Sequence, residues 1–348
     1  MSNHHQILAE IAEKIQIDSN FGISHPDYLP IVTPPDAIQR LRQMTPQLQR
    51  KYSIVQIQNY LYEIYFSHSS LSLSEVAAAA QQSAEIKNNT INGVDINFYR
   101  QLQQHNPGRG YLDPDWQVVA TTETNELVVV KDGLHLHINP PQHLSPDLQL
   151  AAIGDIVPIY LPPDLMGQDT YMMVGNFGSP ARSSSVQVYF NFTPDAALAI
   201  AQKLSQELNN LSIPFQFAIL HNPDLFHRYD AGILSIPEAG YFAIKPILAK
   251  IYQTHQTEFA TDLPLFTQWL APGLGIAEEP EPPFTFGLQR CGLVAAGLVV
   301  AMEQNKTAAV DKLKIIQQEF TTAGIDWLQP HLNPVKIDRD PKSSVLFG

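Results

Sequence analysis

Apolar side chains recur three or four positions apart in three stretches near the start of the chain: residues 7–15, 36–44 and 54–66. This spacing places them on one face of an α-helix. Thr33 and Thr45 each precede a proline, which is typical of a residue that caps a helix N-terminus. We therefore expect a helical N-terminal region over residues 1–105, in which the aromatic side chains of residues 60–66 serve helix packing.

From residue 117 the apolar period changes to two, the period of a half-buried strand. Asp132–Gly133 separates two such runs and predicts a β-hairpin between residues 127–131 and 134–138. Valine and phenylalanine alternate with polar residues over 185–192, so this strand is expected to have one buried and one polar face. Further strands are predicted at residues 156–161, 171–177, 215–221 and 229–236.

Helices are predicted between and after these strands. Thr193–Pro194–Asp195 combines a capping threonine, a proline at the first helical position and an acid in the first turn, and the helix should end near Asn210. A second helix is expected over residues 241–252. The predicted fold class is α+β, with the helical N-terminal region followed by a mainly antiparallel sheet packed against helices.

The stretch 288–302 is apolar on every face except for Arg290, which predicts a buried helix. It follows a turn-rich acidic segment over residues 264–283. After Gly324 we find no periodicity, so the tail is expected to lie over the surface or to be partly disordered. These changes divide the chain into a helical region over 1–105, an α+β domain over 106–325 and an irregular tail over 326–348.

The composition narrows the function classes. A chain of 348 residues with 44% hydrophobic content can bury a sizeable core, in one large or two smaller domains. A formal charge of −13 does not offer the basic surface that nucleic acid requires. The longest apolar run is too short for a membrane span, and the N-terminus lacks the pattern of a secretory signal. The single cysteine, Cys291, excludes a disulfide framework and fits a reducing cytoplasm.

His135 and His137 are two residues apart on a predicted strand, so both imidazoles should project from one face. Such a pair suits proton transfer or a metal, although a metal site would need a third ligand. The alternative is a pair of solvent-facing polar side chains. Lys131 adjoins the hairpin turn, where a lysine is usually only a turn-flanking residue.

Arg290 lies in an apolar helix, where a guanidinium needs either a carboxylate or an anionic ligand. Glu278 or Glu279 could supply the carboxylate. Arg182 and Arg228 precede strands, and Asp230 is an obvious ion-pair partner for Arg228. Three arginines at strand or helix starts in a cation-poor chain favour a phosphorylated ligand, because guanidinium groups bind phosphate bidentately.

Three blocks together resemble the pattern of the HopA-type effector family: SSVQVYFNF, IPFQFAILHNPDLFHRYDAGILSI and PLFTQWLAPGLGIAEEPEPPFTFGLQRCGL. Members of this family outside secretion systems include the lyase component of class V lanthipeptide and thioamitide biosynthesis. The resemblance implies elimination of phosphate from phosphoserine or phosphothreonine in a precursor peptide that a separate Ser/Thr kinase has phosphorylated. It implies dehydroalanine or dehydrobutyrine as the product, without a metal or redox cofactor, and a phosphate bound by Arg182, Arg228 and Arg290.

The resemblance also implies roles for the candidate bases and acids. His137 would be the general acid, and His135 stands where the family has a lysine base, so that Lys131 or Lys245 could take that role. Ala218 stands where relatives often carry a lysine near the phosphate. These two departures leave open an alternative function, a catalytically silent HopA-like module that binds a phosphopeptide or a protein.

Overall fold

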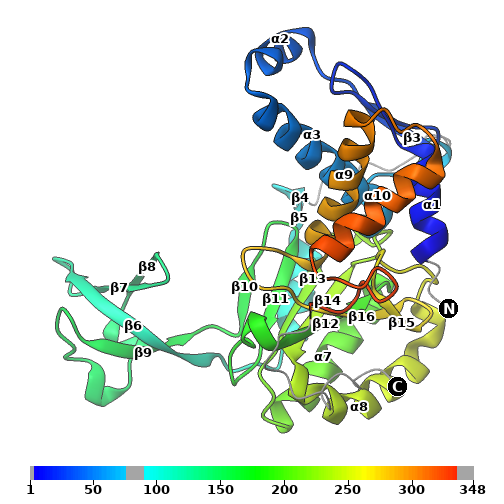
Figure 1. Cartoon of the computed structure of the whole chain (residues 1–348). Helices are drawn as coiled ribbons and strands as arrows, with labels where there is room; N and C mark the ends of the chain where they lie inside the picture. The colour runs from blue at the N-terminus through cyan, green and yellow to red at the C-terminus, as the bar shows by residue number, and fades with distance from the viewer. Residues whose placement is uncertain (1–3, 76–89, 335–348) are drawn as a thin grey trace.

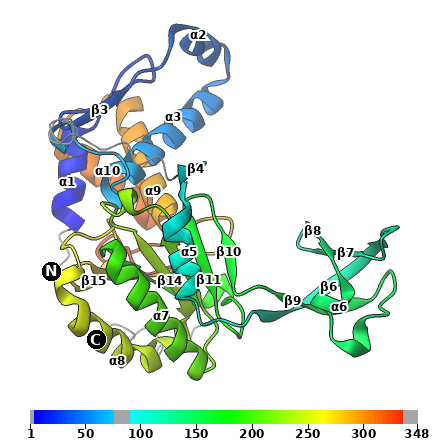
Figure 2. The same cartoon turned by 180° about the vertical axis from the view of Figure 1, so that it is seen from behind.

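The computed structural model of the chain describes residues 4–75 and 90–334 and has three parts, a helical layer, a central sheet and a projecting arm (Figure 1). The view from behind shows the same separation of the arm from the rest (Figure 2). The α+β fold class predicted from the sequence is confirmed.

The central sheet has seven strands in the order β10-β11-β13-β14-β12-β16-β15, and all neighbours are antiparallel. Its strands are β10 (Asp164–Met166), β11 (Thr170–Val174), β12 (Ser185–Phe190), β13 (Gln216–Leu220), β14 (Gly232–Pro237), β15 (Gln268–Ala271) and β16 (Leu274–Glu278). The strands predicted from alternation are present, mostly with shorter bounds. The segment 264–283, expected to be rich in turns, has turns at residues 272–273 and 282–283 but also contains the hairpin of β15 and β16, which was not predicted.

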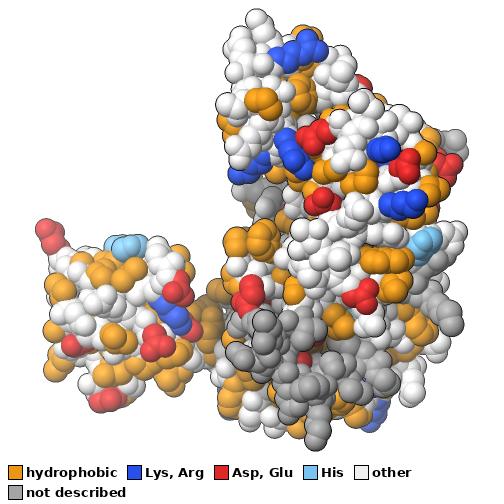
Figure 3. All heavy atoms as spheres, viewed as in Figure 1, with side chains coloured by type: hydrophobic (Ala, Val, Ile, Leu, Met, Phe, Trp, Pro, Cys, Tyr) orange, Lys and Arg blue, Asp and Glu red, His pale blue; other side chains and the backbone are white. Residues whose placement is uncertain are grey.

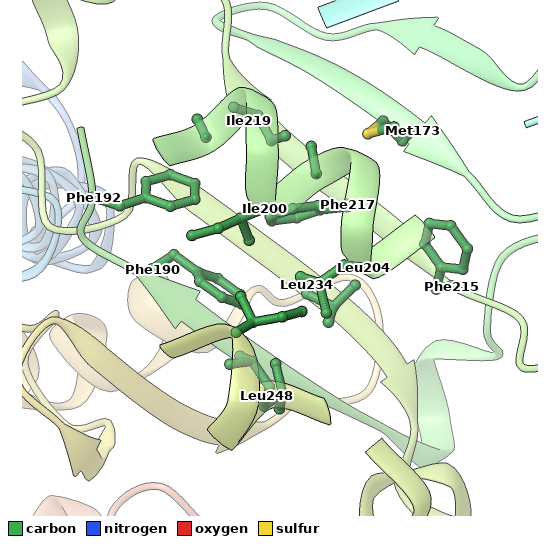
Figure 4. Close-up of a cluster of buried hydrophobic side chains, with 14 of the residues drawn as sticks. Met173, Phe190, Phe192, Ile200, Leu204, Phe215, Phe217, Ile219, Leu234 and Leu248 are labelled. Atoms are coloured by element: carbon green, nitrogen blue, oxygen red, sulfur yellow. The ribbon is translucent and has the colours of Figure 1, made fainter. Parts of the chain in front are cut away.

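One face of the sheet packs against α5 (Ile96–Gln104), α7 (Pro194–Asn210) and α8 (Tyr241–His255). Figure 4 shows Phe190 and Phe217 from the strands meeting Ile200 of α7 and Leu248 of α8. The Thr193 hydroxyl accepts a hydrogen bond from the backbone N–H of Ala196, so the predicted cap of α7 is confirmed.

The helical layer covers the other face of the sheet. It consists of α1 (His4–Lys14), α2 (Pro35–Gln43), α3 (Pro46–Leu61) with its π-helical continuation over Tyr62–Phe66, α9 (Phe286–Glu303) and α10 (Ala309–Thr322). Tyr189 of β12 is buried among these helices. The polar face predicted for this strand is therefore not a solvent face, because the helical layer lies on it.

N-terminal and C-terminal helices share one hydrophobic core within the helical layer. Ile11 of α1, Ile57 of α3, Val294 of α9 and Phe320 of α10 belong to the same buried cluster. The aromatic residues at the end of α3 also serve packing, as predicted, since Tyr62 stacks on Phe66 with ring centroids 4.9 Å apart. By length and composition α9 could cross a membrane, but 56% of it is buried inside the protein, as in a core helix.

Local details of the N-terminal region differ from the prediction. Thr45 caps α3 as expected, whereas the Thr33 hydroxyl donates to the carbonyl of Phe21 and α2 begins after Pro34. The region is also not purely helical. It contains the short strands β1 (Gln16–Ile17), β2 (Ile23–His25), β3 (Tyr28–Ile31), β4 (Thr90–Ile91) and β5 (Val94–Asp95).

The arm, residues 111–161, is a four-stranded antiparallel sheet in the order β8-β7-β6-β9. It comprises β6 (Tyr111–Thr121), β7 (Leu127–Lys131), β8 (Leu134–Ile138), β9 (Ile156–Leu161) and the short helix α6 (Pro140–His143). The predicted hairpin is confirmed, and Asp132 and Gly133 both have positive φ, 50° and 79°. The arm encloses its own small core, which includes Trp116 and Val129.

Candidate functional site

The two candidate imidazoles lie on the arm. Strand register places Ile156 of β9, Gln117 of β6, Val130 of β7 and His135 of β8 in one row across the sheet. Directly paired residues of antiparallel strands point to the same side, so these four share a face.

The pairs Leu112–Tyr160 and Val128–His137 lie on the same side of the sheet. These eight residues form what we call the open face of the arm. Leu144, which follows α6, packs on the opposite side. His135 and His137 are exposed and project together, as the sequence predicts.

Lys131 lies on the other side of that sheet. It pairs with Leu134, next to the buried side of the arm, and its Nζ is 2.9 Å from Asp113 Oδ2 and 2.9 Å from the carbonyl oxygen of Pro114. Its ammonium is 5.9 Å from the Trp116 ring centroid. The structure therefore does not bring Lys131 together with the two histidines, because the sheet itself separates them.

A metal site on the arm would need a third ligand beside the two imidazoles. Within residues 4–75 and 90–334 no group of three or more His, Cys, Asp or Glu side chains could hold a metal ion. In that part of the chain the two histidines remain a pair.

Arg290 is fully buried in the first turns of α9. Its Nε donates to the carbonyl of Pro330 at 2.8 Å, and its Nη2 donates to the carbonyl of Leu332 at 2.8 Å and to Asn333 Oδ1 at 3.2 Å. Nη1 donates to Gln289 Oε1. Burial lowers the pKa of Arg290 to about 10, and the charge of Glu278 partly offsets this effect.

The donors of Arg290 point to oxygen atoms of the protein itself, the main-chain carbonyls of Pro330 and Leu332 and the side-chain amide oxygens of Asn333 and Gln289. The tail up to residue 334 is thus held against α9 by the guanidinium, and residues 335–348 of the predicted tail lie outside the described residues. The neighbour of Arg290, Cys291, is a buried core residue whose thiol pKa is raised by burial.

Arg182 fastens a second loop. Its Nε is 2.7 Å from Glu279 Oε1, and its Nη2 donates to the carbonyl of Phe284 at 2.8 Å. The Glu279 carboxylate is nearly buried and also accepts from the Ser185 hydroxyl. The pair ties the start of β12 to the loop before α9, so this guanidinium already has a carboxylate partner.

Arg228 is paired as the sequence suggested. Its Nε and Nη2 donate to the two carboxylate oxygens of Asp230 at 2.9 and 3.0 Å, and Asp169 lies 3.5 Å from Nη1. Burial alone would lower the pKa of Arg228, but the hydrogen bonds and charge of Asp230 outweigh it and raise the pKa. The Tyr62 hydroxyl adds a contact to Asp230 at 3.5 Å.

Each of the three arginines is hydrogen-bonded to other groups of the protein. Ser185, three positions after Arg182, pairs with Pro237, whereas Gly232, four positions after Arg228, pairs with Phe190 at the other end of β12. Five residues of strand separate the two ends, about 17 Å. The views in Figures 1 and 2 further place β8, with its histidines, on the arm and away from α9.

The remaining candidates lie elsewhere in the fold. Lys245 is exposed on α8, and Ala218 is half-buried on β13, where it pairs with Met172 and Ile233. Neither lies on the arm beside His135 and His137.

A polar cluster that the sequence did not reveal surrounds His68. Its ring stacks on Tyr229 with centroids 4.6 Å apart and planes 3° apart, and its Nε2 is 3.1 Å from Glu75 Oε1. His68 has φ of +53°, which is uncommon for residues other than glycine. The N–H of Tyr229 donates to the carbonyl of Ser67, so the cluster joins the end of α3 to the loop before β14. No short motif marks such a contact between distant segments.

The architecture is that of an α+β protein with three internally bonded arginines and a projecting arm that has a hydrophobic core of its own. The model of the HopA1 effector protein family matches residues 161–332, and in this region the chain is similar to that family. The matched range contains the central sheet, α7 to α10 and all three arginines. Residues 111–160 of the arm precede it.

Two solved structures are similar to this chain. The effector protein from Pseudomonas syringae pv. tomato strain DC3000 shares 16% identity with a TM-score of 0.42, covering 69% of this chain and 81% of that one. The effector protein from Pseudomonas syringae pv. syringae strain 61 shares 13% identity with a TM-score of 0.44, covering 84% and 100%. A search of curated proteins found no match.

Proposed function

We propose that this protein is a HopA-type module that binds a polypeptide partner without chemically changing it. The observation that carries this proposal is the use of all three candidate phosphate-binding arginines in internal contacts. Arg290 donates to main-chain carbonyls, Arg182 to Glu279 and Arg228 to Asp230.

Phosphate elimination requires donors that are directed at the leaving phosphate, together with an acid and a base within hydrogen-bond reach of the substrate. The Arg290 guanidinium is fully buried and hydrogen-bonded to the protein, so a phosphate would have to displace residues 330–333 to reach it. The two imidazoles lie on the arm, and Lys131 lies on its opposite face. These distances and contacts favour binding over catalysis.

Phosphate elimination is the competing hypothesis. The resemblance to the lyase components of peptide natural-product biosynthesis supports it, and so do two exposed neighbouring imidazoles that are available for proton transfer. In that function the substrate would be a precursor peptide phosphorylated by a separate kinase.

Mass spectrometry of phosphopeptides distinguishes the two functions. The full chain is incubated with phosphoserine and phosphothreonine peptides, and the spectra are searched for loss of phosphoric acid. We expect only intact phosphopeptide, both with the wild-type chain and with the double variant His135→Ala/His137→Ala. A dehydrated product that forms with the wild-type chain and disappears in the double variant would overturn the proposal in favour of the lyase.

A further inference from the structure

We infer that the open face of the arm is a docking surface for a cationic polypeptide segment that also carries apolar side chains. This inference rests on the proposed function and names the partner class. It assigns the recognition surface to residues 111–160, which precede the range that the family model matches.

The open face is unusually apolar for an uncovered sheet face. Antiparallel sheets that meet water on one side normally place polar residues there. Here Ile156 is 68% exposed, Tyr160 50% and Leu112 48%, and the loop that leads into β9 adds Leu150 at 96%. The other side of the same sheet is packed against the segment after α6. We take these exposed apolar side chains as the contact residues of the docking surface.

The net charge of the arm indicates the charge of the partner. The arm carries seven carboxylates and one lysine, a formal charge of −6, so about 15% of the residues hold nearly half of the chain's −13. The lysine, Lys131, is already paired with Asp113. Figure 3 shows apolar and acidic side chains side by side on the visible surface of the arm, with little Lys or Arg. The negative electrostatic potential of the arm attracts a basic partner and repels an acidic one.

The same charge argues against two other occupants. A second copy of the chain would bring two arms of charge −6 together, and like charges in contact are unfavourable. A membrane surface rich in anionic lipids would repel the arm for the same reason. Four strands about 4.8 Å apart and about five residues long give a face of roughly 14 by 17 Å. This area suits one short segment of a polypeptide.

The probe is a fluorescein-labelled synthetic 12-residue peptide of alternating lysine and leucine, titrated with the full chain and followed by fluorescence anisotropy. A lysine–serine peptide tests the apolar contribution, and a glutamate–leucine peptide tests the sign of the charge. We expect binding of the lysine–leucine peptide that weakens about tenfold or more in 0.5 M salt. The lysine–serine peptide should bind about tenfold more weakly, and the glutamate–leucine peptide should not bind.

Matched variants locate the surface. Ile156→Ser/Tyr160→Ser removes apolar contacts from the open face, and Phe242→Ser removes a side chain that is 57% exposed on α8. Asp115→Asn/Asp132→Asn removes two charges at positive-φ positions that asparagine tolerates, and Glu13→Gln/Asp36→Asn removes two charges from the helical layer. The arm variants should weaken binding about tenfold. The two controls should match the wild type.

Several results would overturn this inference: no binding of the lysine–leucine peptide, equal affinity of arm and control variants, or preference for the acidic peptide. Sedimentation that shows a dimer broken by the Ile156→Ser/Tyr160→Ser variant would assign the open face to a second copy. Binding to anionic vesicles that depends on the same residues would assign it to a membrane. None of these results bears on the absence of a dehydrated product, so failure of the docking surface and failure of the proposed function can be told apart.

Discussion

Arg290 shows how a single buried charge can hold distant segments together. Replacing it by methionine keeps the apolar stem and removes the donors for the carbonyls of Pro330 and Leu332. We expect Arg290→Met to lower the free energy of unfolding by about 3 kcal/mol or more, because buried acceptors are left unpaired. Urea denaturation measures this. Arg40→Met, at an ion pair whose arginine side chain is 69% exposed, should cost no more than about 1 kcal/mol.

The opposite outcome for Arg290 is equally informative. A methionine variant with wild-type stability but lost binding of a phosphopeptide would show that the guanidinium serves a ligand and not the fold. The structural role assigned here to Arg290 would then be wrong.

His331 makes the stability of the protein depend on pH. Burial, followed by the charge of Arg290, lowers its pKa from 6.5 to about 4. The folded state therefore binds this proton less readily than the unfolded state. The contribution of His331 to stability is therefore fully present above pH 6.5 and is lost as the pH falls toward 4.

Comparison with a variant isolates this effect. At pH 4.5 the contribution of His331 amounts to a loss of about 2 to 3 kcal/mol relative to pH 7. Urea unfolding of the wild type and of His331→Gln at both pH values measures it, and the variant should lose less stability on acidification by about this amount. Identical losses in the two proteins would contradict the assignment. His4, whose pKa is also lowered to about 4 by burial and by His331, contributes in the same direction.

At the residue scale the sequence predicts partners that are close in the chain and misses those that are not. Asp230 is two positions from Arg228, so the pair could be anticipated and is confirmed. The acceptors of Arg290 are backbone carbonyls 40 and 42 positions away, and a carbonyl has no residue type by which a sequence could mark it. A carboxylate or an anionic ligand was therefore the natural expectation for this arginine.

At the scale of elements, the contact between α9 and α10 depends on one glycine. A Cβ added at Gly297 would lie 2.7 Å from the Cα of Ile316 in α10, where backbone must move. We expect Gly297→Ala to destabilise the protein by about 1 to 3 kcal/mol, as overpacking does. Thermal unfolding monitored by circular dichroism measures the change.

Gly292 in the same helix is the matched control. A Cβ there meets only the end of the Gln58 side chain at 3.4 Å. Gly292→Ala should be neutral or stabilise by up to about 1 kcal/mol, because alanine favours helix more than glycine does. If both substitutions changed stability equally, the close contact between Gly297 and α10 would not be what makes Gly297→Ala destabilising.

Elements that depend on local chemistry were predictable, and those set by tertiary packing were not. The Asp132–Gly133 hairpin and the Thr193 cap gave the bounds of β7, β8 and α7. β16 contains a glycine, Gly275, and proved to be a buried strand between β12 and β15, a position that only the sheet explains. Helix α10 was not predicted, although its apolar residues Ile316 and Phe320 have helical spacing and could have revealed it.

At the scale of the whole molecule, the arm behaves as an insertion with adjacent ends. Tyr111 and Leu161, where the chain enters and leaves, are directly paired, and so are Leu112 and Tyr160. Replacing residues 113–159 by Asn-Gly should close a two-residue hairpin between Leu112 and Tyr160. Because the arm has a core of its own, the remaining protein should unfold within about 5 °C of the wild type.

Calorimetry of the shortened protein measures this, with binding of the lysine–leucine peptide as a second readout. If the shortened protein did not fold, the rest of the chain would depend on the arm for its stability, contrary to this prediction. A folded body that still binds the peptide with full affinity would contradict the docking surface alone.

The shared core of the helical layer also has a consequence during synthesis. The Lys312 ammonium in α10 donates to the carbonyl of Ile15 just after α1, across 297 positions of chain. Ribosomes add about 5 to 20 residues per second, so the apolar stripe of α1 waits roughly 15 to 60 s for its partner. During that interval the apolar face of α1 is exposed at the N-terminal end of the nascent chain. A chaperone that shields this face should raise the yield of folded protein.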